Sequence, residues 1–445
     1  MNAGVSLIDI VDKSYERFIL QKRKKITLDL ALSGGQDSMA LLHILSQLAK
    51  KNSFKLRAIH VHHGLSSFAD AWVALCQKFC DALNVEFISS KVKMKKNHPL
   101  GIEGHARELR YSALNNLRAG VLVTAHHQQD QIETFLLQLL RGSGLRGLSS
   151  MQELDEKRML WRPFLNVDQA LIKDYLINNK IEFAQDESNF NDKFDRNFLR
   201  NNILPLVLER FPQALKTINR SINLIAEGFH LNQIIAEKDF HHYLLEDHKL
   251  LALSAFAELD KGRLVNLIRW WLSLNDLQMP SQKLINEIIK QVKNKKVDAL
   301  INIKISDLFS IRTYEDKLYL VDSLIQTDFQ YVWKGQKSIS LPDNTKIFFT
   351  KTKGKGFNLD KITSGQLVIR NRQGGEKFKP IQNQPTRKVK SLLQSSRIPP
   401  WERSFIPLLV DGENVVAIPE FGTDSQYQVL SDEIGYSVSW NKQPS

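Results

Sequence analysis

The chain has 445 residues and a formal net charge of +13, with 42% hydrophobic and 24% charged residues. This balance is typical of a soluble globular protein that needs no disulfide framework, and the length predicts about three domains. The positive charge favours a polyanionic partner, nucleic acid first, because Lys and Arg near phosphates release bound counterions.

The N-terminal segment does not have the pattern of an export signal. Charged residues interrupt its apolar stretch, Leu7–Asp12, and no later segment has the roughly 18 continuous apolar residues of a membrane span. The chain has only two cysteines, which suits a reducing compartment. We expect a cytoplasmic protein with no membrane partner.

Residues 26–123 alternate between short apolar runs and amphipathic stretches, which predicts an α/β domain with a doubly wound parallel sheet. The predicted strands are Thr27–Leu32, Arg57–Val61, Glu86–Ser89 and Val121–Thr124, and the predicted helices are Ser38–Lys50, Asp70–Leu83 and Gly104–Ala119. Cys76 and Cys80 share the apolar face of the second helix, so we interpret them as core thiols. A redox or metal-binding pair is the less favoured alternative.

A polar loop, Ser33-Gly34-Gly35-Gln36-Asp37-Ser38, joins the first strand to the first helix. The glycines allow close backbone approach, and the helix N-terminus offers donors to a phosphate chain. Asp37 beside phosphates makes sense only with a divalent cation. The loop lacks the Walker A ending and resembles the PP-loop of the N-type ATP pyrophosphatases, which implies attack on the α-phosphate of ATP. A glycine-rich turn without a ligand is the alternative.

The second strand ends in His60-Val61-His62-His63-Gly64-Leu65, at the sheet edge that also carries the loop. We interpret His60 as an adenosine contact. A histidine metal site is disfavoured, because no carboxylate lies near these residues in the sequence.

The fourth strand leads into Thr124–Thr134, where His126, Asp130 and Glu133 follow at helical spacing. If this segment opens a helix, the three side chains share one face near its N-terminus. Two carboxylates beside an imidazole suit a Mg²⁺ site with a group that takes a proton. An exposed polar face is the alternative.

Two basic segments follow. Arg141–Leu148 is rich in glycine, and we interpret it as a segment that closes over a polyanionic substrate, with a plain linker as the alternative. Asp186–Asn189 precedes Asp195–Arg200, in which Arg196 and Arg200 share a helix face. This pair of guanidinium groups is suited to stabilise charge on the α-phosphate as pyrophosphate leaves.

The remaining sequence predicts two further domains. We expect a catalytic domain over residues 1–212, a helical domain over 213–325 and a basic α+β domain over 333–440. Lys351–Arg403 holds thirteen Lys or Arg against three Asp or Glu, so most of the net charge lies there. We expect this domain to grip RNA phosphates, with a solvated basic face as the alternative.

Together these motifs resemble the tRNA(Ile)-lysidine synthase family, in its long three-domain form. The residues that carry the resemblance are Ser33–Ser38, His60–Leu65, Glu103–Tyr111, Thr124–Thr134, Arg141–Leu148, Asp186–Arg200, Asn371–Lys377 and Pro399–Arg403. The resemblance implies that ATP adenylates the wobble cytidine of an isoleucine tRNA with a CAU anticodon. Free L-lysine then attacks C2, and lysidine, AMP and pyrophosphate are the products. The resemblance also implies that the helical domain contacts the tRNA and that the basic α+β domain binds it. A homodimer is a further possibility.

The resemblance further implies roles for single residues. Asp37 and Glu133 would hold Mg²⁺, Asp130 would hold the metal or act as a base, and His126 with Arg196 would stabilise phosphate charge. Many family members have two adjacent aspartates where this chain has Gln129-Asp130, so Asp130 is the only carboxylate of that doublet.

Two other functions compete with this one. A PP-loop tRNA 2-thiolase needs cysteines that carry sulfur, and Cys76 and Cys80 are poorly placed on a helix for that. A non-catalytic tRNA-binding protein is disfavoured by Asp37, Asp130 and Glu133, because carboxylates near phosphates are unfavourable without a metal.

Overall fold

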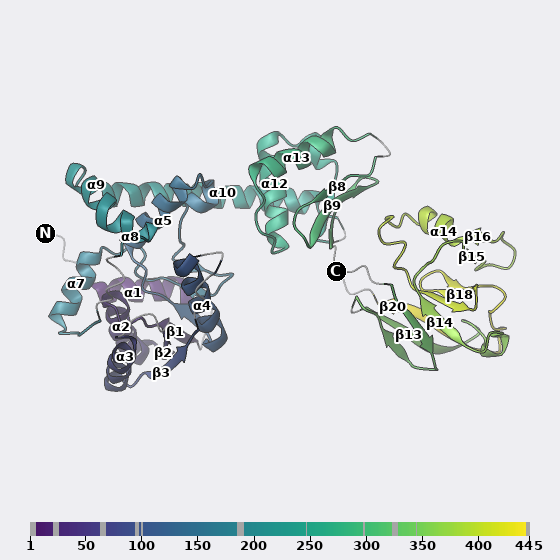
Figure 1. Cartoon of the computed structure of the whole chain (residues 1–445), viewed down its shortest axis with the longest axis horizontal. Helices are drawn as coiled ribbons and strands as arrows, with labels where there is room; N and C mark the ends of the chain where they lie inside the picture. The colour runs from purple at the N-terminus through teal and green to yellow at the C-terminus, as the bar shows by residue number, and fades with distance from the viewer. Residues whose placement is uncertain are drawn as a thin grey trace. The chain divides into compact units, whose positions relative to one another are not determined.

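The structure is a computed structural model in which residues 6–20, 26–62, 68–93, 98, 101–184, 191–245, 247–296, 299–322, 328–343 and 345–441 are described. The chain divides into two compact units, residues 1–232 and 233–445 (Figure 1). The three predicted domain ranges are a finer division than these units and stay a prediction.

The first unit contains a six-stranded sheet in the order β3-β2-β1-β4-β6-β5, in which only the edge strand β5 runs antiparallel to its neighbour. The predicted doubly wound parallel sheet is therefore confirmed. Its elements are α1 (Leu7–Tyr15), η1 (Glu16–Leu20), β1 (Thr27–Ala31), α2 (Gln36–Asn52), β2 (Lys55–His62), α3 (Ala69–Leu83), β3 (Glu86–Lys91), α4 (Gly101–Leu117), β4 (Val121–Val123), α5 (Gln128–Leu140), α6 (Leu145–Leu148), β5 (Leu154–Asp155), β6 (Leu160–Trp161), α7 (Gln169–Asn178), α8 (Asp195–Phe198), η3 (Leu199–Ile203), α9 (Leu204–Arg210) and the start of α10 (Ala214–Tyr243).

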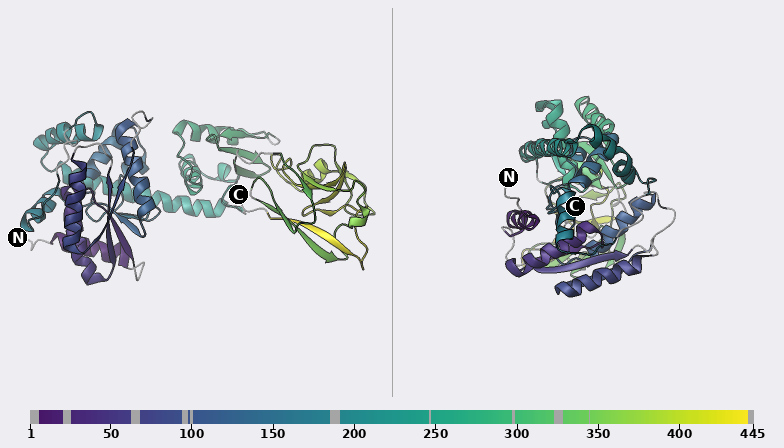
Figure 2. Two further views of the ribbon diagram at one scale, coloured as in Figure 1. Left: turned by 60° about the horizontal axis from the view of Figure 1, so that its bottom comes forward. Right: turned by 90° about the vertical axis from the view of Figure 1, so that its left-hand side faces the viewer.

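Alternating side chains of the strands pack helices on both faces of this sheet (Figure 2). Leu28 and Leu30 of β1 pack in a core with α1, α2, α3 and α7. Ile59 of β2 points the other way and packs with Leu114 of α4. The period of two along buried strands therefore builds two hydrophobic layers around one sheet.

The strand order reverses at β1, which pairs with β2 on one side and with β4 on the other. Ligands of open α/β sheets bind outside the carboxyl ends of the strands at such a switch point. The loop after β1 and the segment after β4 both begin there. Beside them, α5 packs on α9 and α10 through the buried side chains of Ile132, Leu204 and Ile222.

The second unit begins within α10 and combines helices with short antiparallel strands. Its first part packs α11 (Ala255–Glu258), α12 (Lys261–Leu274) and α13 (Gln282–Lys293) in one core with a sheet of β7 (Leu250–Ala252), β10 (Lys317–Asp322), β9 (Phe309–Tyr314) and β8 (Asn302–Lys304). The predicted helical region is present. The four-stranded sheet was not predicted.

The last part of the second unit is α+β, as predicted. Its elements are β11 (Gln330–Trp333), β12 (Ser338–Ser340), β13 (Lys346–Lys353), η4 (Leu359–Lys361), β14 (Leu367–Arg370), β15 (Lys377–Phe378), β16 (Arg387–Lys388), α14 (Val389–Ser395), β17 (Leu408–Asp411), β18 (Asn414–Ile418), β19 (Gly422–Thr423) and β20 (Ile434–Asn441). They form a five-stranded sheet, a three-stranded sheet and the hairpin β15–β16. None of the helices in the described ranges is long and apolar enough to cross a lipid bilayer.

Candidate active site

Two serine hydroxyl groups form hydrogen bonds within the loop between β1 and α2. The Ser33 and Ser38 hydroxyls lie 3.0 Å apart, and the Ser38 hydroxyl donates to the Gly35 carbonyl at 3.0 Å. Gly34 has a φ of +88°, a left-handed conformation that favours glycine. A Cβ on Gly34 would lie 3.2 Å from Cys76 Sγ, so the residue also has little room beneath it.

Asp37 stands on the first turn of α2, where the helix dipole favours a negative charge. Its Oδ1 is buried and accepts no hydrogen bond from any residue that the structure describes. Burial raises the pKa of Asp37, and the nearby Asp130 adds to the rise against the opposing charges of His127 and Arg200. An orphaned, buried carboxylate oxygen at a helix N-terminus is suited to bind a cation.

His127, for which no role was predicted, connects the loop with α5. It is the N-cap of α5, where its Nδ1 accepts the backbone N–H of Gln129 at 3.2 Å. The other ring nitrogen, Nε2, lies 3.7 Å from Asp37 Oδ2 and 3.5 Å from Asp130 Oδ2. A buried imidazole thus stands between two carboxylates that are 93 positions apart in the sequence.

Asp130 and Glu133 are held by two arginines from α8 and the π-helical turn η3. Arg196 donates to Asp130 Oδ1 at 2.8 Å and to Glu133 Oε2 at 2.6 Å. Arg200 donates to Glu133 Oε1 at 2.6 Å and to Glu133 Oε2 at 2.9 Å. Glu133 is fully buried, and both of its oxygens accept hydrogen bonds from guanidinium groups.

The charges in this cluster shift the pKa of its members. Burial alone would raise the pKa of Asp130, but the charges of His127 and Arg196 lower it well below the usual range. Burial works against the charge of Arg200, yet the hydrogen bond to Glu133 raises its pKa. Asp130 therefore stays ionised and both arginines stay charged at physiological pH.

His126 lies before α5 and not on its face. The helix begins at Gln128 because His127 caps it, so the expected shared helix face of His126, Asp130 and Glu133 holds only for the two carboxylates. The Nδ1 of His126 lies 2.9 Å from the Thr124 hydroxyl. Burial lowers the pKa of His126 to about 3, so its ring is neutral at physiological pH.

His60 supports the loop from the neighbouring strand. Its buried ring donates from Nδ1 to the Leu32 carbonyl at 2.9 Å, and Cys76 Sγ lies 3.9 Å from the same nitrogen. The interpretation of His60 as an adenosine contact stays a prediction. The expected motif residues His63–Leu65 and Asp186–Asn189 lie outside the described residues.

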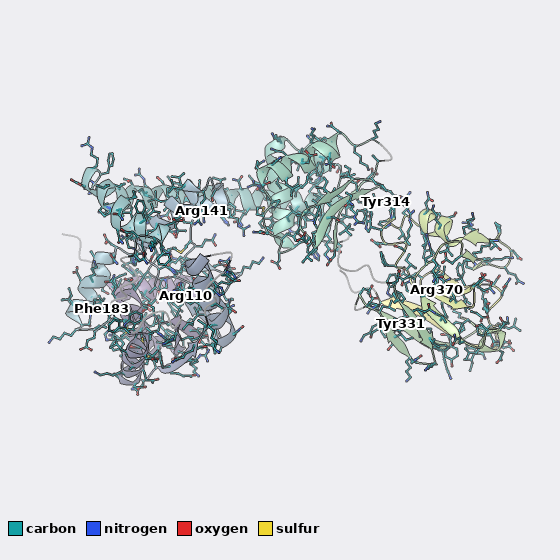
Figure 3. The ribbon with its side chains drawn as sticks, viewed as in Figure 1. Arg110, Arg141, Phe183, Tyr314, Tyr331 and Arg370 are labelled. Carbon is teal, nitrogen blue, oxygen red and sulfur yellow. The ribbon has the colours of Figure 1, made fainter. Side chains whose placement is uncertain are left out.

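One more arginine near the site lies on α4. Burial lowers the pKa of Arg110 (Figure 3), and the charges of Arg196 and Asp130 also act on this group. Its guanidinium lies 5.7 Å from the centre of the Tyr111 ring, and that of Arg107 lies 5.2 Å from the same ring. The sequence motif Glu103–Tyr111 had contained these residues without a role for any of them.

Three family models match the chain. They are described as a PP-loop domain over residues 9–207, a TilS substrate binding domain over residues 251–319 and a TilS substrate C-terminal domain over residues 367–440. The three models follow one another along the chain in the order of the elements described above.

Two relatives match nearly the whole chain. The tRNA(Ile)-lysidine synthase of Nitrosomonas europaea is 33% identical over 98% of this chain and 97% of the relative. That of Coxiella burnetii is 32% identical over 95% of each. Among solved structures, the U34-tRNA thiolase NcsA from Methanococcus maripaludis covers 50% of this chain and 78% of its own, at 18% identity and a TM-score of 0.40. That last likeness is too weak to indicate an activity.

Proposed function

The chain belongs to the tRNA(Ile)-lysidine synthase family, and from this premise we propose that it joins free lysine to C2 of the wobble cytidine of an isoleucine tRNA with a CAU anticodon. ATP activates the cytidine by adenylation, and lysidine, AMP and pyrophosphate are the products. The observation that carries the proposal is the convergence of Asp37, His127 and Asp130 at the switch point of the sheet.

The loop Ser33–Ser38 supplies the phosphate-binding part of this site. Its backbone N–H groups and the N-terminus of α2 would hold the β- and γ-phosphates of ATP. A loop without a Walker lysine that holds these two phosphates leaves the α-phosphate open to attack. This supports adenylation over transfer of the γ-phosphoryl group.

For Mg²⁺, the donor set fits best at Asp37 and Asp130. Asp37 Oδ1 has no hydrogen-bond partner among the described residues, and Asp130 lies beside His127, as Asp37 does. When bound there, Mg²⁺ would neutralise phosphate charge. Asp130 and Glu133 both accept hydrogen bonds, but the Asp130 side chain is 13% exposed, whereas Glu133 is fully buried against the two arginines. We therefore assign Glu133 to hold Arg196 and Arg200 in place. These guanidinium groups are suited to stabilise the charge that develops on the α-phosphate.

The nucleophile is the ε-amine of lysine, which attacks only after its ammonium loses a proton. Asp130 has a lowered pKa and is therefore a weak base, so we propose that it attracts the ammonium or the metal and does not take the proton. The neutral ring of His126 is likewise suited to hydrogen bonding and not to carrying charge.

We propose that the enzyme acts on tRNA in the cytoplasm. We also propose that two copies of the chain associate through the first unit. Leu206, Phe211, Leu224 and Leu231 on and beside α9 and α10 are each exposed for at least 60% of their surface. Large exposed apolar side chains on neighbouring helices favour association.

The form of ATP cleavage tests the proposal. The purified enzyme is incubated with ATP, isoleucine tRNA and lysine, and nucleotide products are separated. We expect AMP and pyrophosphate, with turnover that requires the tRNA and is lost when its wobble cytidine is replaced by uridine. Formation of ADP and phosphate, or equal turnover with the uridine variant, would contradict it.

The 2-thiolase alternative is not supported by the cysteines. Cys76 and Cys80 are fully buried in the core beneath the loop. A sulfur carrier needs an accessible thiolate. The same incubation with a sulfur donor in place of lysine is expected to yield no product.

A further inference from the structure

Three side chains of metal-binding type meet at the start of α4, and the proposed reaction uses none of them. His105 and Glu108 lie one turn apart on the helix, and His98 comes just before it. Each offers one ligand atom, and the three atoms lie within 4.8 Å of one another. Among the described residues, this is the one such group that contains two histidines and a carboxylate.

His105 is the unexplained member of this cluster. It is only 6% exposed, and neither of its ring nitrogens has a hydrogen-bond partner among the residues that the structure describes. Burying a polar ring without partners is unfavourable, and such a group calls for an unseen ligand. The ring of His98 stacks on it with centroids 4.0 Å apart, so the two imidazoles already lie side by side.

The distances suit a small tetrahedral ion. Glu108 Oε2 lies 3.8 Å from His105 Nδ1 and 3.9 Å from His98 Nε2. Bonds of about 2.1 Å in a tetrahedron place ligand atoms roughly 3.4 Å apart, so each of the two pairs with Glu108 must close by about half an ångström. The two histidine nitrogens lie within 4.8 Å of each other and must close by at most about 1.4 Å. The near-parallel rings must also fan apart, so that one nitrogen of each ring can point at the ion.

We propose that His98, His105 and Glu108 form a binding site for Zn²⁺, distinct from the Mg²⁺ site at Asp37. Two imidazoles and one carboxylate favour Zn²⁺ over Mg²⁺, which prefers oxygen ligands. The side chain of Glu108 is 58% exposed, so water can complete the coordination from the solvent side. The ion fastens residue 98 to the helix that also carries Arg107 and Arg110, and it thereby stiffens this wall of the active site.

Zinc titration of the metal-stripped, full-length enzyme without a histidine tag tests the site. Isothermal titration calorimetry at pH 7.5 is expected to give one Zn²⁺ per chain, and the bound enzyme to melt at a higher temperature. His105→Gln and Glu108→Gln are each expected to weaken binding more than tenfold. His98→Asn, outside the helix, provides a third variant with little risk to folding.

Two control variants separate this site from other zinc-binding groups. His241 lies 4.0 Å from Glu237 on exposed surface of α10, so His241→Gln should leave the titration unchanged. Asp37→Asn should also bind one Zn²⁺, because the Mg²⁺ site is separate. Absence of stoichiometric binding, wild-type affinity in both His98→Asn and His105→Gln, or loss of binding in Asp37→Asn would overturn the proposal. These outcomes concern the zinc site alone, and the proposed lysine ligation is tested by its own experiment.

Discussion

His127 performs two tasks with the two nitrogens of one ring. Nδ1 caps α5, and Nε2 stands between Asp37 and Asp130. Asparagine is a good N-cap but is too short to reach both carboxylates. The two tasks can therefore be separated by substitution.

We predict that His127→Asn keeps the wild-type free energy of unfolding but lowers the rate of lysidine formation about 10- to 100-fold, as misplaced groups do. His127→Ala should lose the cap as well, and with it about 1 kcal/mol of stability. Urea unfolding and single-turnover kinetics measure the two effects. A wild-type rate for His127→Asn would show that Nε2 has no part in the reaction.

Asp130→Asn removes the ionised carboxylate that faces His127 and Arg196. We expect tRNA affinity to stay at the wild-type level and lysidine formation to fall by about a thousandfold or more, as for loss of a charge essential in the transition state. Gln129→Asn, at the adjacent position, is the matched control and should leave both unchanged. Lysidine formation near the wild-type rate by the purified Asp130→Asn variant would refute the assigned role.

The two cysteines should be inert in the folded enzyme. Burial raises the pKa of Cys76 and of Cys80 to about 12, so about one thiol in ten thousand is ionised at pH 8. Iodoacetamide should label neither at pH 8 until urea is added. Because these pKa values are raised, the neutral thiols favour the fold fully below pH 9, and that contribution is lost as the pH climbs toward 12. Rapid labelling of the native protein would reopen the thiolase alternative.

At the scale of elements, α5 depends on α8 and η3 for the partners of its buried carboxylate. Glu133→Gln would leave Arg196 and Arg200 partly unpaired, and we predict a loss of about 3 kcal/mol in the free energy of unfolding. Asp307→Asn, which breaks an exposed pair with Lys304, should have no measurable effect. Equal urea midpoints for the two variants would mean that the buried cluster does not support the fold.

The elements also show which parts of the site a sequence reveals. The loop Ser33–Ser38 could be predicted because its residues are contiguous and follow a buried strand. Contact between His127 and Asp37 could not, because it depends on the pairing of β1 with β4. The sheet of the middle region also escaped prediction. Its strands β7 and β8 have three residues each, too few for alternation to show. Its six-residue strands β9 and β10 were missed because the region up to about residue 320 is predicted as helical throughout.

At the scale of the whole molecule, the positive charge predicts a strong dependence of tRNA binding on salt. Arg387 and Lys388 are exposed on the hairpin β15–β16, in the basic stretch of the sequence. We expect their double replacement by glutamine to weaken tRNA binding and to reduce the slope of log affinity against log salt by about 1 to 2.

Lys50 and Lys78, exposed on α2 and α3, provide a control with the same change of charge. Their double replacement should leave the salt slope as in the wild type. If both pairs change the slope equally, the effect is one of net charge, and the C-terminal basic face has no special part in RNA binding.

The most direct test of the central claim is the identity of the wobble nucleoside after the reaction. Isoleucine tRNA with a CAU anticodon is incubated with the enzyme, ATP and lysine, digested to nucleosides and analysed by mass spectrometry. We predict that the wobble cytidine gains one lysine with loss of its C2 oxygen, and that omission of lysine or of ATP prevents this. An unchanged cytidine, or a nucleoside in which sulfur replaces that oxygen, would contradict the account.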